Sequence, residues 1–160
     1  MDNLWAPWRM EYIMSDKSRE CIFCTGPEAG NDREKKILYR GKCSYVVINI
    51  YPYSNGHLMI SPYRHVSALN GLNDEELLEI GQLTQKSTTI LQEAYSPDGF
   101  NIGYNIGKSG GAGFDEHLHA HIVPRWAGDT NFMSVLAETR VQPEHIEDTY
   151  RRLLPLFQKL

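Results

Sequence analysis

The sequence predicts an α+β fold built on an antiparallel sheet of about five strands with two main helices. Short β-branched and aromatic runs alternate with turn residues, and two helical segments stand apart from them. The links between the first three strands are short, and the first is short enough for a hairpin. A chain of 160 residues, of which 41% are hydrophobic and 22% charged, suits one globular domain with an ordinary core.

Five segments have the composition or the alternation of β-strands. "KILYR" and "SYVVINI" are rich in β-branched and aromatic residues, and the link "GKC" between them indicates a hairpin. "FNIGYNIG" alternates apolar residues with Asn and Gly, and "HLHAHIV" alternates histidine with apolar residues. The expected strands are 36–40, 44–50, 57–61, 100–107 and 117–123.

Two segments have the features of helices. A 3.6-residue apolar stripe that includes Leu77 runs over 74–95, where Asn73 can cap the first turn and Glu76 completes a capping-box spacing. A second helix is expected over 144–158, with a proline near its end that should kink or shorten it. The helices are therefore expected to form a layer against the sheet.

The chain is expected to form a single domain over residues 1–160, because it contains neither an internal repeat nor a low-complexity segment. Residues 1–36 should be an irregular N-terminal segment. Residues 37–132 should form the core, and 133–160 the C-terminal helical region.

Charge and hydropathy exclude several classes of partner. The net charge is −4 and no run of Lys or Arg reaches four residues, so neither nucleic acid nor a membrane surface is an expected partner. No apolar stretch approaches the roughly 20 residues of a membrane helix, and the N-terminus does not resemble a signal peptide. Three cysteines without a secretion signal favour a reducing, cytoplasmic location.

The segment "HLHAHIV" places three of the six histidines, His117, His119 and His121, at alternate positions. In a strand they would share one face, with neighbouring Cα atoms about 6.6 Å apart, so the row can line a cleft and all three are not expected to converge on one ion. Three interpretations remain open. They are a catalytic face, a metal site that also uses Asp115 or Glu116, and three solvated histidines on an exposed strand.

A glycine-rich loop, "GKSGGAG" over 107–113, precedes the histidine row. Glycine permits positive φ, and successive exposed N–H groups can bind phosphate oxygens. The loop leads into a strand, so it is neither a Walker A loop nor a dinucleotide fingerprint. A neutral histidine is a competent nucleophile toward phosphorus, and a neighbouring imidazolium can protonate the leaving oxygen. The combination favours a catalytic face.

These features resemble the histidine triad (HIT) family, whose motif is three histidines separated by single apolar residues. Matching segments in the order of the family are "CIFC", "VVINIYPYSNGHLMISPYRHV", "GFNIGYNIGKSGGAGFDE" and "PRWAGDTNF", which cover most of residues 21–132. Together with "LWAPWRMEYI", they look most like the diadenosine tetraphosphate phosphorylases and their dinucleoside polyphosphate hydrolase relatives. The resemblance implies a HIT-like fold and a homodimer whose two sheets join into one.

The resemblance also implies an activity, namely nucleotidyl transfer from a dinucleoside polyphosphate to phosphate or water. The middle histidine, His119, is the implied nucleophile, which forms a covalent nucleotidyl-histidine intermediate. His117 and His121 flank it, and His57 matches an upstream active-site histidine. No cofactor is implied for the chemical step.

Further residues match the substrate-binding positions of the family. Asn49 matches the side chain that holds the ribose hydroxyls. Gly113 stands where the family usually has Gln or Ser, so a contact to the leaving group is either missing or supplied by Lys108 or Ser109. The implied substrate-binding residues are Asn49, Asn105, Lys108, Ala112 and Gly113.

Cys21 and Cys24 have the spacing of half a zinc site. The alternative is that both side chains pack in a partly buried turn. By analogy with the related hexose-phosphate uridylyltransferases, the resemblance implies that His65 and His117 complete a structural zinc site.

Two other functions stay open alongside transfer from a dinucleoside polyphosphate. One is a nucleotide-binding regulatory module with slow turnover, and the other is a hydrolase of adenylated small molecules such as phosphoramidates. A metal-dependent hydrolase that uses the histidine row as ligands is a further alternative, and it predicts an immediate loss of activity on chelation.

Overall fold

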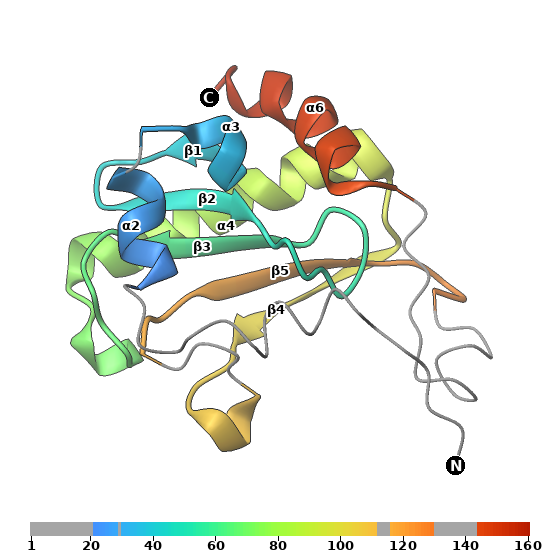
Figure 1. Cartoon of the computed structure of the whole chain (residues 1–160). Helices are drawn as coiled ribbons and strands as arrows, with labels where there is room; N and C mark the ends of the chain where they lie inside the picture. The colour runs from blue at the N-terminus through green and yellow to red at the C-terminus, as the bar shows by residue number, and fades with distance from the viewer. Residues whose placement is uncertain (1–20, 29, 112–115, 130–143) are drawn as a thin grey trace, which may run out of the picture.

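The protein, seen here as a computed structural model, is described for residues 21–28, 30–111, 116–129 and 144–160. In these residues five strands form one antiparallel sheet in the order β1-β2-β3-β5-β4 (Figure 1). The predicted α+β fold with an antiparallel five-stranded sheet is confirmed. The strands are β1 (Ile37–Arg40), β2 (Ser44–Ile48), β3 (Leu58–Pro62), β4 (Gly99–Tyr104) and β5 (Ala120–Arg125).

The helices are α2 (Ile22–Glu28), α3 (Asp32–Lys35), α4 (Asp74–Tyr95) and α6 (Ile146–Phe157), and two 3-10 turns are η1 (Leu69–Gly71) and η2 (Lys108–Gly110). Helices α2 and α3 correct the expectation that this N-terminal part is irregular. Helix α6 continues past Pro155 to its end at Phe157, so the proline lies in the last turn instead of ending the helix.

Helix α4 has the predicted bounds and the predicted cap. The Asn73 side chain accepts the Glu76 N–H and the Glu76 carboxylate accepts the Asn73 N–H, which completes the capping box. The buried face differs at one position, because Leu77 is 45% exposed whereas Glu76 is 3% exposed. Glu76 can be buried because Arg64 donates two hydrogen bonds to its carboxylate.

Strand β5 begins later than predicted, at Ala120 instead of residue 117. Strand β3 pairs with it from Ile60 opposite Ala120 onward. Before that point the chain bends toward another partner, because the Leu118 N–H donates to the Val66 carbonyl at 2.6 Å. Two of the three triad histidines therefore lie on an irregular segment that is tied to the loop after β3.

The sheet has two differently covered faces (Figure 1). Helices α4 and α6 pack on one face, and the main core there includes Val46, Ile60 and Ile122. Helix α2 lies on the opposite face, over a smaller apolar cluster that is here called the α2 cluster. The α2 cluster consists of Phe23, Ile37, Tyr45 and Val47, with Cys21, Met59 and Tyr63 packed against it.

The strand register places the histidines on the α2 face. Val47 pairs with Met59, and Met59 pairs with His121. Directly paired residues point to the same side of a sheet, so His121 shares a face with the α2 cluster and lies away from α4. Leu118 belongs to the main core on the other side, as the predicted alternation requires.

Strands β1 and β4 are the outer strands of the sheet. On β4 the expected alternation is absent from the burial, because Asn101, Ile102 and Gly103 are all exposed and Ile102 is 51% exposed. Among the helices of the described residues, none has both the length and the apolar character needed to cross a lipid bilayer.

Candidate active site and metal centre

The histidines of the triad are buried, which contradicts the interpretation that they are solvated on an exposed strand. His117, His119 and His121 are 1%, 6% and 8% exposed, and His57 is 1% exposed. Burial lowers the pKa of His121 from 6.5 to about 4, with a further contribution from the charge of His119. Burial also lowers the pKa of His117 and His119, so all three imidazoles are neutral near pH 7 and each has one ring nitrogen with a lone pair.

The tautomer of His119 follows from its partner. Its Nδ1 lies 2.8 Å from the backbone carbonyl oxygen of His117. A carbonyl only accepts hydrogen bonds, so Nδ1 carries the proton and Nε2 carries the lone pair. This is the tautomer that a nucleophilic histidine attacking through Nε2 requires.

A chain of hydrogen bonds fixes the tautomers of His57 and His121 as well. His57 Nδ1 lies 3.0 Å from the Tyr53 backbone N–H and 3.3 Å from the Asn49 side-chain nitrogen, so it accepts. His57 Nε2 must then carry a proton, which it donates to His121 Nδ1 at 2.9 Å. His121 consequently carries its own proton on Nε2.

Asn105 and Tyr53 lie against this histidine pair. The Asn105 amide is 3.4 Å from His121 Nε2 and 3.5 Å from the Tyr53 hydroxyl. Since His121 Nε2 is a donor, the amide can accept from it only through its oxygen, after a 180° rotation that exchanges two atoms of similar size. The Tyr53 ring lies 4.6 Å from the His57 ring and 5.8 Å from the His121 ring.

The side chains of the four predicted metal ligands lie close together. Cys21 Sγ and Cys24 Sγ lie 3.2 and 3.5 Å from His117 Nδ1, and Cys24 Sγ lies 3.3 Å from His65 Nδ1. The four ligand atoms are all within 4.8 Å of one another. Zinc bonds of about 2.3 Å to sulfur and 2.0 Å to nitrogen place tetrahedral ligands roughly 3.5 Å apart, so these residues fit the ion.

His117 is oriented for the metal role. Its Nε2 donates to the Pro62 carbonyl at 3.0 Å, which leaves the Nδ1 lone pair pointing at the two sulfurs. Burial and the neighbouring Cys21 raise the pKa of Cys24 to about 11, so a thiolate at this position needs a bound cation. With both ring nitrogens committed, His117 is a poor candidate for acid–base work.

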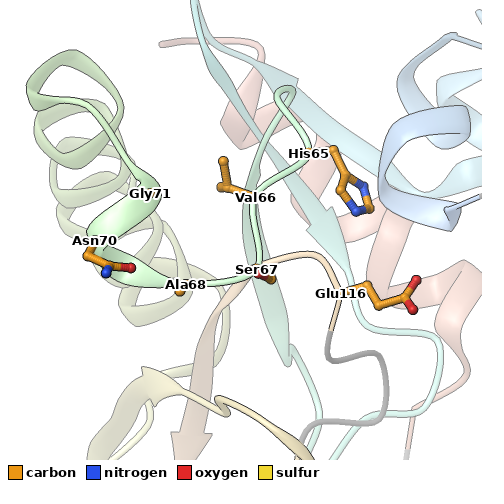
Figure 2. Close-up of a pocket in the computed structure, with 7 residues that line it drawn as sticks. All are labelled: His65, Val66, Ser67, Ala68, Asn70, Gly71 and Glu116. Carbon is orange, nitrogen blue, oxygen red and sulfur yellow. The ribbon is translucent and has the colours of Figure 1, made fainter.

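A pocket lies outside the metal centre, between the loop after β3 and the start of the triad segment (Figure 2). His65 is the residue that it shares with the metal centre. None of His57, His119 and His121 lines it, so it is not the site of the histidine chemistry. Its lining residues are His65, Val66, Ser67, Ala68, Asn70, Gly71 and Glu116.

The structure locates some of the predicted binding residues and not others. Asn49 is buried beside His57, and its amide oxygen accepts the Tyr51 N–H at 2.9 Å. Lys108 is exposed on η2. Ala112, Gly113 and Asp115 lie outside the described residues.

The sequence did not predict one aromatic contact of the site. The Phe23 ring stacks on the His119 ring, with centroids 4.5 Å apart and planes at 23°. Its position between Cys21 and Cys24 was the available indication, because a cysteine pair that reaches His117 also carries the intervening phenylalanine to the triad.

Residues 31–128 match the HIT domain family. The chain is 42% identical to an AP-4-A phosphorylase from Mycobacterium tuberculosis, over 96% of this chain and 83% of that protein. It is 27% identical to a bis(5'-adenosyl)-triphosphatase from Dictyostelium discoideum, over 79% of this chain and 89% of that protein.

Solved structures of the same fold include a zinc-bound histidine triad family protein from Mycobacterium smegmatis. That structure has a TM-score of 0.69 and 26% identity, and the match covers 88% of this chain and 94% of that one. A histidine triad nucleotide-binding protein from Sulfolobus tokodaii has a TM-score of 0.68 at 24% identity, with 87% and 90% covered, and supports the fold alone.

Proposed function

The chain belongs to the histidine triad family, and from this premise we propose that it transfers a nucleotidyl group from a diadenosine polyphosphate to phosphate through His119. The substrate class and the acceptor are supported by the 42% identity to an AP-4-A phosphorylase over 96% of the chain. The observation that carries the chemistry is the hydrogen bond from His119 Nδ1 to the His117 carbonyl, which leaves the Nε2 lone pair for attack.

In the proposed first step, the Nε2 lone pair of His119 attacks the α-phosphorus. A P–N bond forms, the P–O bond to the rest of the polyphosphate breaks, and its electron pair stays on the leaving oxygen. With diadenosine tetraphosphate the leaving group is ATP, and AMP remains bound to His119. The Nε2–H of His121, whose tautomer follows from the hydrogen bond with His57, would donate to a phosphate oxygen.

In the second step an oxygen of phosphate attacks the same phosphorus. A P–O bond forms, the P–N bond breaks, and the electron pair returns to His119 Nε2, which releases ADP. Water as the acceptor would give AMP through the same intermediate. Hydrolysis, including that of adenylated small molecules, is therefore the second candidate function.

The remaining substrate contacts follow from the family pattern. Asn49 would hold the ribose hydroxyls, because it lies 3.3 Å from His57 at the edge of the histidine cluster. Asn105, beside His121, would contact phosphate oxygens. The loop residues Lys108, Ala112 and Gly113 complete the proposed substrate-binding set.

The metal centre is proposed to hold one structural zinc ion. Four protein ligands close the coordination sphere, so the ion would tie α2 to the loop after β3 and to the triad segment. The covalent histidine mechanism requires no metal in its chemical step. This separates the proposal from the alternative of a metal-dependent hydrolase.

A homodimer is proposed through the outer strand β4, because Ile102 on it is exposed and, within the described residues, no strand pairs with its outer edge. Pairing of two β4 strands would extend the sheet across both copies.

Product analysis with diadenosine tetraphosphate, with and without phosphate, tests the proposal. Formation of ATP and ADP only in the presence of phosphate is the expected result. ATP and AMP without phosphate would move the assignment to hydrolysis. Nucleotide binding without turnover of any diadenosine polyphosphate would favour a regulatory binding module.

A further inference from the structure

Phe23 lies between the two cysteines of the metal centre, yet its ring faces the proposed nucleophile. The side chain is 4% exposed and belongs to the α2 cluster. Its ring is 4.5 Å from the His119 ring at 23°, a stacked arrangement, and 5.4 Å from the His117 ring at 42°. The same short turn therefore contacts both the metal-ligating histidine and the nucleophile.

Contacts of three residues hold the turn that carries Phe23. Cys21 and Cys24, immediately around it, belong to the metal-ligand group. The Tyr45 hydroxyl donates to the Phe23 carbonyl at 2.8 Å in a buried position. A backbone fixed in this way limits where the Phe23 ring can lie, so the ring is a rigid surface against His119.

His119 needs such a surface. Its hydrogen bond to the His117 carbonyl fixes one atom, Nδ1, and leaves the ring free to swing about its side-chain torsions. The His121 ring meets the His119 ring in a T-shaped contact at 4.9 Å. Stacking by Phe23 lies along the face of the His119 ring and restricts rotation of its plane, and the ring plane decides where the Nε2 lone pair points.

We propose that Phe23 is a positioning residue that holds the His119 ring in the orientation for attack on phosphorus. The proposal rests on the proposed function, because orientation matters only if His119 is the nucleophile. A misdirected lone pair lowers the rate of the chemical step without weakening the binding of substrate. In this role of Phe23, the turn that carries Cys21 and Cys24 both stabilises the fold and orients the nucleophile.

The test uses the full chain with its metal and the variant Phe23→Leu, which keeps the site apolar but removes the ring. We expect kcat for diadenosine tetraphosphate to fall about tenfold, while KM changes less than about twofold. Val47→Ala is the matched control, because Val47 belongs to the same α2 cluster and carries no ring that could stack on His119. It should lower stability and leave kcat unchanged.

A second readout does not depend on turnover. Nitrogen NMR of the His119 ring at pH 7 should show one tautomer, with the proton on Nδ1, in the wild type and in Val47→Ala. In Phe23→Leu the same signals should broaden or shift toward a tautomer mixture. If the wild type does not turn over diadenosine polyphosphates but these signals change, the proposed function fails and the positioning contact stands.

Two results would overturn the proposal. One is a Phe23→Leu protein with wild-type kcat and wild-type His119 signals. The other is a change confined to KM, which would mean that Phe23 contacts the substrate instead of orienting the nucleophile. Should Phe23→Leu fail to fold, Phe23→Met fills a similar volume with a flexible chain and carries the same expectations.

Discussion

At the scale of single residues, His121 links burial to pH dependence. Its pKa lies near 4 in the fold and at 6.5 in an unfolded chain, chiefly because burial disfavours the charged imidazole. Between these two values the unfolded chain binds the extra proton, so the free energy of unfolding should fall as the pH drops from about 6.5 to about 4. Urea unfolding at several pH values measures this loss.

The variant His121→Asn is the control for this pH effect. It should show a smaller loss over the same range, although His117 and His119 still contribute because their pKa values are also lowered. An identical pH dependence in both proteins would mean that His121 is not the group responsible.

The second prediction at this scale concerns Asn49. Replacement by Ala should raise KM more than it lowers kcat, because hydrogen bonds to ribose hydroxyls are made equally in the ground and transition states. One such bond is worth roughly 0.5–1.5 kcal/mol, which is about a two- to twelvefold rise in KM. With a 2′,3′-dideoxy substrate, the wild type and Asn49→Ala should have similar KM values. A difference that persists there would place Asn49 away from the ribose.

The reactive residues were open to prediction because residue type and spacing define them. The alternate histidines and the cysteine pair could be read directly, and the family resemblance added His57 and His65. The ring contacts of Phe23 and Tyr53 could not be predicted, although the position of Phe23 between Cys21 and Cys24 indicated that it lies near the triad. Their contribution is the position of an aromatic ring against an imidazole, which depends on how distant segments pack.

At the scale of elements, the hairpin between β1 and β2 depends on a residue of α4. The Glu79 carboxylate accepts the backbone N–H groups of Lys42 and Cys43 at 2.6 and 2.8 Å. A Cβ atom at Gly41 would lie 2.7 Å from Glu79 Oε1 and 2.8 Å from the Ser44 carbonyl oxygen. We therefore expect Gly41→Ala to destabilise the protein by about 1–3 kcal/mol in urea unfolding.

Gly81→Ala is the matched control for this substitution. Gly81 is exposed within α4, and an added Cβ there meets nothing within 4 Å. Alanine in a helix is better than glycine by about 0.5–1 kcal/mol, so this variant should be slightly more stable than the wild type. Equal effects of both substitutions would contradict the packing argument at Gly41.

Local and distant interactions explain which elements could be predicted. The bounds of α4 follow from its capping box and its apolar period, both of which are encoded within the helix. The start of β5 depends on the bond between Leu118 and Val66, whose residues are far apart in the sequence. Helix α2 was missed for the same reason, because its burial depends on the sheet and the triad segment.

At the scale of the whole molecule, the metal centre joins the N-terminal segment to the sheet. Elemental analysis should find about one zinc ion per chain. Cys24→Ser should lower the zinc content and lower the melting temperature by several degrees, since one of four ligands is weakened. Cys43→Ser is the matched control and should change neither, because Cys43 lies outside the ligand group. If protein that was never exposed to a chelator contains well below one zinc ion per chain, Cys21 and Cys24 are packing residues and not metal ligands.

The central claim is that a nucleotide becomes covalently attached to His119 during turnover. The direct measurement is peptide mass spectrometry after the protein has reacted with diadenosine tetraphosphate without phosphate and has been quenched in alkali, where a P–N bond survives. An adenylyl group on His119 is predicted, which phosphate removes as ADP, and the surface control His145→Asn should carry the same adduct. Turnover retained in His119→Ala, or an adduct on a different residue, would contradict the account.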